Sequence, residues 1–455
     1  MSKEVNLEYK KYYSKIFAFF YFIQGFVQGI PGLVLAPYVA NILGNQYDIA
    51  QFLIVAFLGY LPWTIKMIIG IINDKWGSKK YGRRFPFIAG FGIFGGIWWI
   101  IMALYLPAND SIYVFLALYL FMIMVGMAFS DTALDGLILD ITPKEKLGKV
   151  QGFTWACLLL GVVIGGALLG LIFMILDIVP ILFILTGILM IIACILPYFI
   201  EELPVIAVTA KQMGRDILSI FTRRKNYKVM IFTFTSSITG AIIVRFFGLV
   251  ILISMGIIDV NETILSITKG SAVDLLGWTS VFYFFNGMGT IIGSLIAGKF
   301  ADKNRKKAVS LAYLTYIPFC LVSIIPFIST GNYLVAIIFG FIGLVVFGTL
   351  QAALLISSAT IRADIVKKEY PNLKSTYYAL LISCWNGGLA LGTLLGAFLI
   401  IIFSSYFMDF NTLYFLVSLC CAGVLLVSFS CFKLIDPKDY ELEHVIGEEK
   451  EVYFA

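Results

Sequence analysis

Histidine and charged side chains are scarce in this chain. Its 455 residues include one histidine, His444, and only 13% are Asp, Glu, Lys or Arg. His444 lies in an acidic tail, so neither a histidine metal site nor a serine–histidine dyad is expected. The seven cysteines lie in or beside apolar runs and lack the spacing of metal ligands, which is typical of small buried residues. The sequence therefore predicts no enzyme, no metal ion and no cofactor.

Two further patterns are missing. No glycine-rich segment ends in the Lys-Ser or Lys-Thr pair of a nucleotide-binding loop. Energy for any transport would therefore come from a gradient rather than from ATP. Nor do the apolar runs alternate in polarity, as the strands of a membrane barrel would.

Long apolar runs are what the chain has in abundance. Hydrophobic residues make up 60% of it, too many for a soluble core to hide. A helix needs about 20 apolar residues to cross a bilayer, and twelve runs meet that need. They cover residues 15–40, 49–72, 85–106, 112–140, 149–176, 178–199, 228–256, 277–299, 308–328, 333–362, 375–403 and 411–432. The sequence predicts an all-α, polytopic membrane protein with twelve transmembrane helices.

Basic residues set the orientation of these helices. Of the 33 Lys and Arg, all but Lys66, Arg245 and Lys269 lie in the two ends of the chain and the even-numbered loops. By the positive-inside rule, both termini and those loops face the cytoplasm. The net charge of +6 therefore reports topology and contact with membrane lipid rather than nucleic-acid binding. We expect an integral, multi-pass protein of the plasma membrane.

A short charged signature occurs once in each half of the chain. Its glycines and its aspartates each recur after 228 positions, which is about half the chain. The copies contain Gly70, Asp74, Lys75, Arg83 and Arg84, and then Gly298, Asp302 and Arg305. Other landmarks repeat at nearly the same period: Gly161 and Gly388 are 227 apart, and Asp140 and Asp364 are 224 apart. The chain reads as a tandem duplication.

The repeat predicts the domain organisation. Two six-helix bundles of parallel topology cover residues 1–200 and 228–433. A polar cytoplasmic linker, 201–227, joins them, and an acidic cytoplasmic tail, 434–455, follows.

The signature resembles one known superfamily. Gly70-Ile-Ile-Asn-Asp74-Lys75-Trp-Gly77 is similar to the loop between helices two and three of the major facilitator superfamily, and Gly298–Arg305 occupies the corresponding loop between helices eight and nine. The resemblance implies a transporter that alternates between inward and outward states, with the signature residues as a cytoplasmic gate. We expect it to work as a monomer.

Local motifs point to subgroups of that superfamily. Four of them resemble the muropeptide permease, acetyl-coenzyme A and folate/biopterin transporter group: Tyr21-Phe-Ile-Gln24-Gly25, Leu61-Pro-Trp-Thr-Ile-Lys66, Asp131-Thr-Ala-Leu-Asp135-Gly136, and Gly82-Arg83-Arg84. The stretch Gly82–Ile88 is also similar to cation-coupled glycoside and sucrose symporters. The subfamily, and with it the substrate, stays open.

Three ionisable residues in the first half are candidates for ion coupling. A charged side chain at the bilayer centre costs about 2.5 to 3.5 kcal/mol on insertion scales, so each one needs a reason. Asp131 and Asp135 are four positions apart and share a helix face. Either they form a structural ion pair with Lys66, or one of them takes up a proton or a sodium ion and thereby releases Lys66.

Arg245 is the candidate for gripping an anionic substrate. It lies past the middle of the seventh predicted helix, and Gln24 and Gln28 reach a comparable depth in the first. Snorkelling, or pairing at an extracellular gate, is the competing interpretation of Arg245. Asn286, Gln351 and Asn386 are weaker candidates, because each fits an interhelical hydrogen bond equally well.

These observations predict a proton-coupled secondary transporter of a small or medium-sized organic solute, with an anionic solute favoured. A sugar or glycoside cation symporter is the nearest alternative. A lipid transporter and a non-transporting membrane assembly factor are the others.

Overall fold

The computed structural model describes residues 9–44, 49–78, 80–202, 210–255, 269–327, 333–406 and 410–442. In these ranges the chain is helical apart from turns, short connections and one isolated bridge, between Ser78 and Gly82. Eleven helical segments of the described chain are long and apolar enough to cross a membrane, and α15 (Lys374–Tyr406) covers the remaining predicted span, 375–403. The all-α membrane fold is confirmed.

The chain divides into two compact units. Unit 1 holds Met1–Thr222, Lys269–Val281 and Val366–Ser383, and unit 2 holds the remainder. The predicted domain boundaries at 200 and 228 stay a prediction. Unit 1 also contains two segments from the second half of the sequence, Lys269–Val281 and Val366–Ser383.

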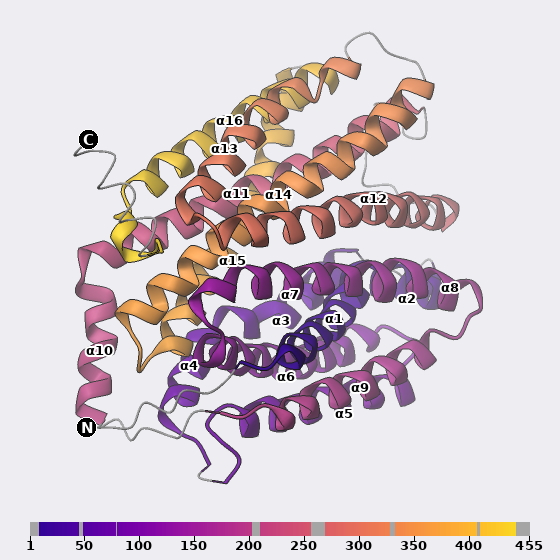
Figure 1. Ribbon diagram of the computed structural model, residues 1–455. Helices are drawn as coiled ribbons and strands as arrows, with labels where there is room; N and C mark the ends of the chain where they lie inside the picture. The colour runs from indigo at the N-terminus through magenta and orange to yellow at the C-terminus, as the bar shows by residue number, and fades with distance from the viewer. Residues whose placement is uncertain are drawn as a thin grey trace, which may run out of the picture. The chain divides into compact units, whose positions relative to one another are not determined.

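Unit 1 is built from long helices that run side by side (Figure 1). α5 packs against α6 and α9, α3 against α6, and α1 against α7 and η4. The elements are α1 (Lys11–Leu33), α2 (Leu35–Leu43), α3 (Ile49–Tyr60), η2 (Leu61–Thr64), α4 (Lys66–Lys75), α5 (Phe85–Leu104), α6 (Ile112–Ile141), η3 (Lys144–Lys146), α7 (Leu147–Gly161), η4 (Val162–Leu169), α8 (Gly170–Ile175), α9 (Val179–Ile195), η5 (Leu196–Phe199) and α10 (Ala210–Thr222).

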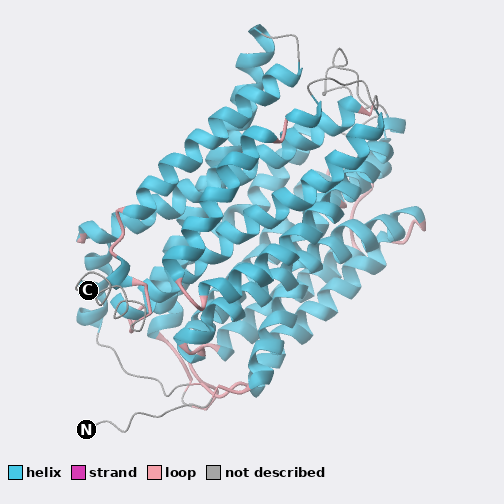
Figure 2. Ribbon diagram, turned by 45° about the horizontal axis from the view of Figure 1, so that its top comes forward, coloured by secondary structure: helices cyan, strands magenta, loops and turns pink. Residues whose placement is uncertain are grey.

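Unit 2 repeats part of this packing. α16 packs against α11 and α13, as α9 packs against α1 and α5 in unit 1. Its elements, partly shared with unit 1, are α11 (Arg224–Ser254), α12 (Lys269–Ala301), α13 (Arg305–Val322), η6 (Ile325–Phe327), α14 (Tyr333–Glu369), α15, α16 (Phe410–Lys433) and η7 (Pro437–Asp439). Figure 2 shows that helix dominates the described chain throughout.

Two of the predicted helices are interrupted. The run 15–40 forms α1 and α2 with a break at Val34, shortly after Pro31. The run 49–72 forms α3 and α4, separated by the 3₁₀ turn η2 around Pro62. Proline lacks a backbone N–H and clashes with the preceding turn, so an apolar run of sufficient length still breaks. The second interruption makes Lys66 the first residue of a new helix.

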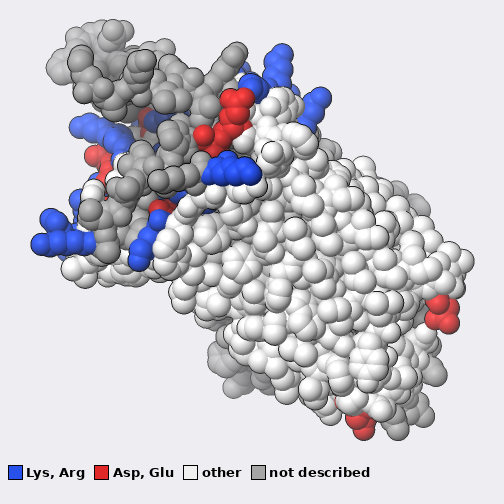
Figure 3. All heavy atoms as spheres, turned by 90° about the horizontal axis from the view of Figure 1, so that it is seen from below, with Lys and Arg blue, Asp and Glu red and all other residues white. Residues whose placement is uncertain are grey.

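The charged and uncharged parts of the surface are separated. On the face drawn in Figure 3, Lys and Arg gather at one end of a broad surface without charged side chains. The exposed side chains of the membrane helices include Phe57, Ile97, Val114 and Ile181. Large apolar side chains exposed along membrane-length helices require lipid as their solvent.

Glycines let α1 approach α7 and η4 closely. A Cβ atom at Gly161 would lie 1.9 Å from the carbonyl oxygen of Phe22, and one at Gly25 would lie 2.0 Å from that of Leu158. Such distances leave no room for a side chain. η4 continues the contact as a π-helix, with Gly166 against Gly29.

We predict that Gly161→Ala destabilises the protein, while Gly90→Ala does not. The first substitution overpacks a backbone contact, which costs about 1 to 3 kcal/mol. Gly90 has open space around its Cα and serves as the matched control. The measurement is the thermal unfolding midpoint of the purified protein in detergent. Equal midpoints for the two variants would show that the helices separate without cost.

Candidate functional site

Two helices of unit 1 bring the predicted ionisable residues together. Along α4, Lys66, Gly70 and Asp74 recur every fourth position and share one face. Along α6, Asp131 and Asp135 share one face, and Asp140 follows five positions later, about 140° around the helix. α4 packs on α6, so the two sets of polar groups lie close to each other in an otherwise apolar unit.

Lys66 and Asp131 form a buried ion pair. Lys66 Nζ contacts Asp131 Oδ2, and the two side chains are 2% and 4% exposed. The ring of Trp63 covers the ammonium, with its centroid 4.6 Å from Nζ. The cation is thus held by a carboxylate and an aromatic face together.

Asp135 has a different partner. The hydroxyl of Tyr21 on α1 donates to Asp135 Oδ1 at 2.6 Å, and the ring of Trp155 lies 6.4 Å from that of Tyr21. Gln24, one turn further along α1, is buried, and its Oε1 atom accepts no hydrogen bond. Sequence reasoning missed Tyr21 as a site residue. Its spacing from Gln24 on one face of α1 was the available signal.

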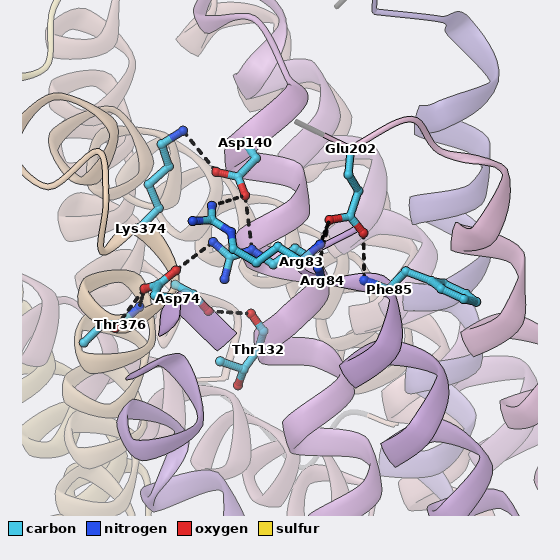
Figure 4. A network of polar contacts seen from close by, with 10 residues as sticks. Asp74, Arg83, Arg84, Phe85, Thr132, Asp140, Glu202, Lys374 and Thr376 are labelled. Atoms are coloured by element: carbon cyan, nitrogen blue, oxygen red, sulfur yellow. Dashed lines mark hydrogen bonds and ion pairs between the residues drawn. The ribbon is translucent and has the colours of Figure 1, made fainter. Parts of the chain in front are cut away.

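Asp74 caps the start of α15. Its Oδ2 atom accepts hydrogen bonds from the backbone N–H and the hydroxyl of Thr376, both at 2.8 Å (Figure 4). A carboxylate at a helix N-terminus also complements the helix dipole. Gly70 makes the approach possible, because a Cβ there would lie 2.7 Å from Thr376 Cα. Two residues 302 positions apart in the sequence therefore meet within unit 1.

Arg84 joins this cap to α6. Its guanidinium is fully buried and pairs with Asp74 at 2.7 Å and with Asp140 at 3.1 Å. Arg83 and Lys374 reach the same Asp140 carboxylate at 2.8 and 3.1 Å (Figure 4). Burial alone would lower the pKa of Arg84, but the Asp74 and Asp140 carboxylates raise it above its ordinary value. The cation is therefore permanent.

Glu202 caps the start of α5. Its carboxylate accepts hydrogen bonds from the backbone N–H groups of Arg83, Arg84 and Phe85 at 2.7 to 2.8 Å. Gly82 precedes them with φ +85°, a conformation that side chains disfavour, and a Cβ there would also strike the carboxyl group of Glu202. Burial raises the pKa of Glu202, while the three N–H groups oppose that rise.

Unit 2 contains the same arrangement. Arg305 is fully buried and pairs with Asp364 at 2.8 Å and with Asp302 at 3.4 Å. Glu441 accepts from the backbone N–H groups of Arg305 and Lys306 at 3.0 and 2.8 Å, as Glu202 does at α5. The predicted repeat therefore extends from sequence to contacts. Sequence reasoning missed both glutamates, although each follows the last helix of its half.

The other candidates of the cytoplasmic signature differ in position. Lys75 is exposed, and its Nζ lies 5.0 Å from the centroid of the Trp76 ring, outside the contacts of Asp74 and Arg84. Gly298 is buried on α12.

The remaining predicted substrate residues are described by their own contacts and burial. Asn286 donates to the carbonyl of Leu344 at 3.2 Å, and Gln351 donates to that of Gly240 at 3.3 Å. Both are thus interhelical hydrogen bonds within unit 2. Asn386 on α15 and Gln28 on α1 are half-buried. Arg245 belongs to α11, but its side chain lies outside the described residues.

Comparisons with known proteins give a consistent picture. The family model described as Major Facilitator Superfamily matches residues 17–354 and 246–452. No curated protein sequence matches the chain.

Solved structures share the fold at low identity. One is the transporter FucP in the outward conformation, with 12% identity and a TM-score of 0.64. The others are a variant of the E. coli fucose:proton symporter FucP, at 11% and 0.58, and the human organic anion transporter MFSD10, at 12% and 0.63. Each alignment covers 92% of this chain and 98% of the other.

We predict that Arg84→Gln and Arg305→Gln each destabilise the protein strongly. Removing one partner of a buried ion pair leaves carboxylates uncompensated, at a cost of about 3 to 5 kcal/mol. Exposed Lys15 provides the control variant Lys15→Gln, which should change little. The readout is the fraction of protein that stays monodisperse after heating in detergent. A melting point unchanged by Arg84→Gln would mean that the cluster contributes nothing to stability.

Proposed function

Because the chain belongs to the major facilitator superfamily, we propose that it is a proton-coupled secondary transporter that moves a small or medium-sized organic anion by alternating access. The observation that carries the coupling part is the buried pairing of Lys66 with Asp131, next to Tyr21 and Asp135. Four polar side chains in an apolar membrane unit are costly to bury. A transport cycle that uses a change of charge gives them a purpose.

An anionic substrate is supported by residues of two helices. Arg245 on α11 supplies a cation of fixed charge, and a guanidinium suits carboxylate or phosphate groups. On α1, Gln24 keeps a buried oxygen that accepts no hydrogen bond, and an unsatisfied buried polar atom is costly unless a ligand completes it. Gln28 follows one turn later. We assign these three residues to substrate binding.

Asn286, Gln351 and Asn386 take a secondary place in this proposal. The hydrogen bonds of Asn286 and Gln351 to backbone carbonyls favour a packing role. Asn386 is half-buried on α15 and is retained as a weaker substrate contact.

The cytoplasmic gate is proposed at the two copies of the signature. In the first copy, Asp74 must release Thr376 for α15 to move away from α4. Arg83 and Arg84 stabilise the closed arrangement through Asp140. In the second copy, Asp302 and Arg305 hold α12 and α13 together.

The proposed topology follows the basic residues. Both termini, the linker and the acidic tail face the cytoplasm, in a monomer of the plasma membrane. The two six-helix halves, 1–200 and 228–433, are the proposed domains of the transport cycle.

Two solved neighbours bear on the choice of substrate. One is a fucose:proton symporter, which keeps the sugar or glycoside symporter as the second candidate, and another is an organic anion transporter. Arg245 favours the anion. A lipid transporter and a non-transporting assembly factor remain the other candidates.

We predict uptake of an anionic organic solute into proteoliposomes, accelerated when the outside is acidic. The panel contains peptides with amino sugars, pterins, acyl-coenzyme A and uncharged glycosides, each tested with and without a pH gradient. Protein-free liposomes are the control. Uptake of a glycoside alone would select the sugar symporter, and uptake of none would count against transport of these classes.

Arg245→Ala should weaken binding of the transported anion about 10- to 100-fold, because a hydrogen bond to a charged group contributes about 1.5 to 3 kcal/mol. Arg224→Ala, at the exposed start of the same helix, is the control and should bind as the parent does. Binding is measured by titration calorimetry in detergent. An unchanged affinity in Arg245→Ala would remove this residue from the site.

A further inference from the structure

The two carboxylates of α6 have chemically different partners. Asp131 contacts the ammonium of Lys66, and Asp135 accepts from the hydroxyl of Tyr21. The contacts of Lys66 in the structure are with Asp131 and the Trp63 ring. The sequence treats the two aspartates as equivalent, but their surroundings separate them.

Hydrogen-bond chemistry decides which carboxylate can change its protonation state without losing its partner. An ammonium has only donors, whereas a phenol hydroxyl is both donor and acceptor. If Asp131 were protonated, Lys66 would keep its charge in an apolar unit without a counter-ion, which is costly. If Asp135 is protonated, its carboxyl O–H donates to the oxygen of Tyr21, and the contact survives with its direction reversed.

We propose that Asp135 takes up and releases the coupled proton, with Tyr21 as its positioning partner, and that Lys66 and Asp131 form a fixed ion pair that stays charged throughout the cycle. The step is a proton transfer alone: an O–H bond forms on the Asp135 carboxylate as a hydronium ion becomes water. No electron moves. The assignment rests on the proposed function, because it names the residue that performs the coupling.

Charged and titratable groups near Asp135 come from α6 itself, from α1 and α15, and from the start of α5. Asp131 lies one turn before it on α6, paired with Lys66 of α4. Tyr21 comes from α1, and Tyr378 of α15 lies within electrostatic range of Tyr21. On the other side is Arg84, since a Cβ at Gly136 would lie 2.8 Å from its guanidinium carbon.

This position links the proton to the gate. Asp135 lies between the fixed ion pair and the Arg84–Asp140 pair, and each is about one helical turn away. Gly136, the residue after Asp135, adjoins the guanidinium of Arg84. α6 therefore connects Asp135 to the Arg84–Asp140 pair, which belongs to the network at the start of α15.

The geometry around Asp135 suits a proton. The oxygens of Asp135 and Tyr21 lie 2.6 Å apart, a distance at which a proton can be held between them. Within the part of the chain that the structure describes, no three His, Cys, Asp or Glu side chains come together to hold a metal ion.

The second half of the sequence has no ionisable residues at the positions that correspond to Lys66, Asp131 and Asp135. At the repeat distances of 224 and 228 positions, Leu355, Ala359 and Ser294 stand where the first half has Asp131, Asp135 and Lys66. The gate network is duplicated, whereas the ionisable cluster is not. Structural needs of the fold would apply to both copies, so the unduplicated cluster is better explained by a task performed once.

The test is an infrared difference titration of the full-length protein in nanodiscs, without substrate. Acidification should produce the absorption of protonated buried carboxyl groups, one component of which belongs to Asp135. Asp135→Asn should abolish that component. The paired variant Lys66→Met with Asp131→Asn, which removes both charges of the ion pair together, should retain it. Tyr21→Phe should raise the midpoint by about 1 to 2 pH units, because it removes a donor that favours the ionised form.

Three results would overturn the assignment: an absorption undiminished in Asp135→Asn, loss of the same component in the paired variant, or a midpoint unmoved by Tyr21→Phe. Uptake in proteoliposomes separates this failure from failure of the proposed function. Proton-dependent uptake that Asp135→Asn leaves unchanged removes this assignment alone. A normal titration in a protein that takes up no solute removes the proposed function and, with it, the coupling role.

Discussion

A buried guanidinium organises the polar part of this protein. Arg84 is fully enclosed and pairs with carboxylates from two helices, Asp74 of α4 and Asp140 of α6. Such a cation is tolerated inside protein only when its charge is balanced and its donors are directed. The position of α4 relative to α6 is therefore tied to one side chain. The cap that Asp74 places on α15 depends on the same carboxylate.

The buried Arg–Asp network occurs in both halves of the chain, whereas the Lys66 cluster occurs in one. Arg305 repeats the pairing with Asp302 and Asp364, and Glu441 repeats the cap made by Glu202. What occurs twice is the polar framework that the two halves share. The cluster of Lys66, Asp131, Asp135 and Tyr21 occurs once, so the two halves have the same framework and different chemistry.

Much of the fold was predictable because lipid imposes simple rules. The length of an apolar run gives a helix, and the recurrence of Gly70 and Asp74 at Gly298 and Asp302 gives the duplication. The break at Pro62 was harder to predict, because a hydropathy value contains no information on the backbone N–H that proline lacks.

The site was predictable only in part, for a related reason. The pairing of Lys66 with Asp131 follows from opposite charge at similar depth. Tyr21 and Glu202 were missed because one partner of each contact is a hydroxyl or a backbone N–H, and neither is recognisable as a partner from composition. The role of Arg245 in substrate binding stays a prediction, because its side chain lies outside the described residues.

The cap made by Glu202 has a consequence for how the first half of the chain ends. Its carboxylate binds the backbone at residues 83 to 85 rather than any side chain. The end of the sixth membrane segment is thereby fastened to the start of the third by a non-covalent clasp. These hydrogen bonds hold Glu202 in place between α9 and the linker that follows. The last residues of the first half are thus bound to a helix of that same half, which suits a chain that contains two similar halves end to end.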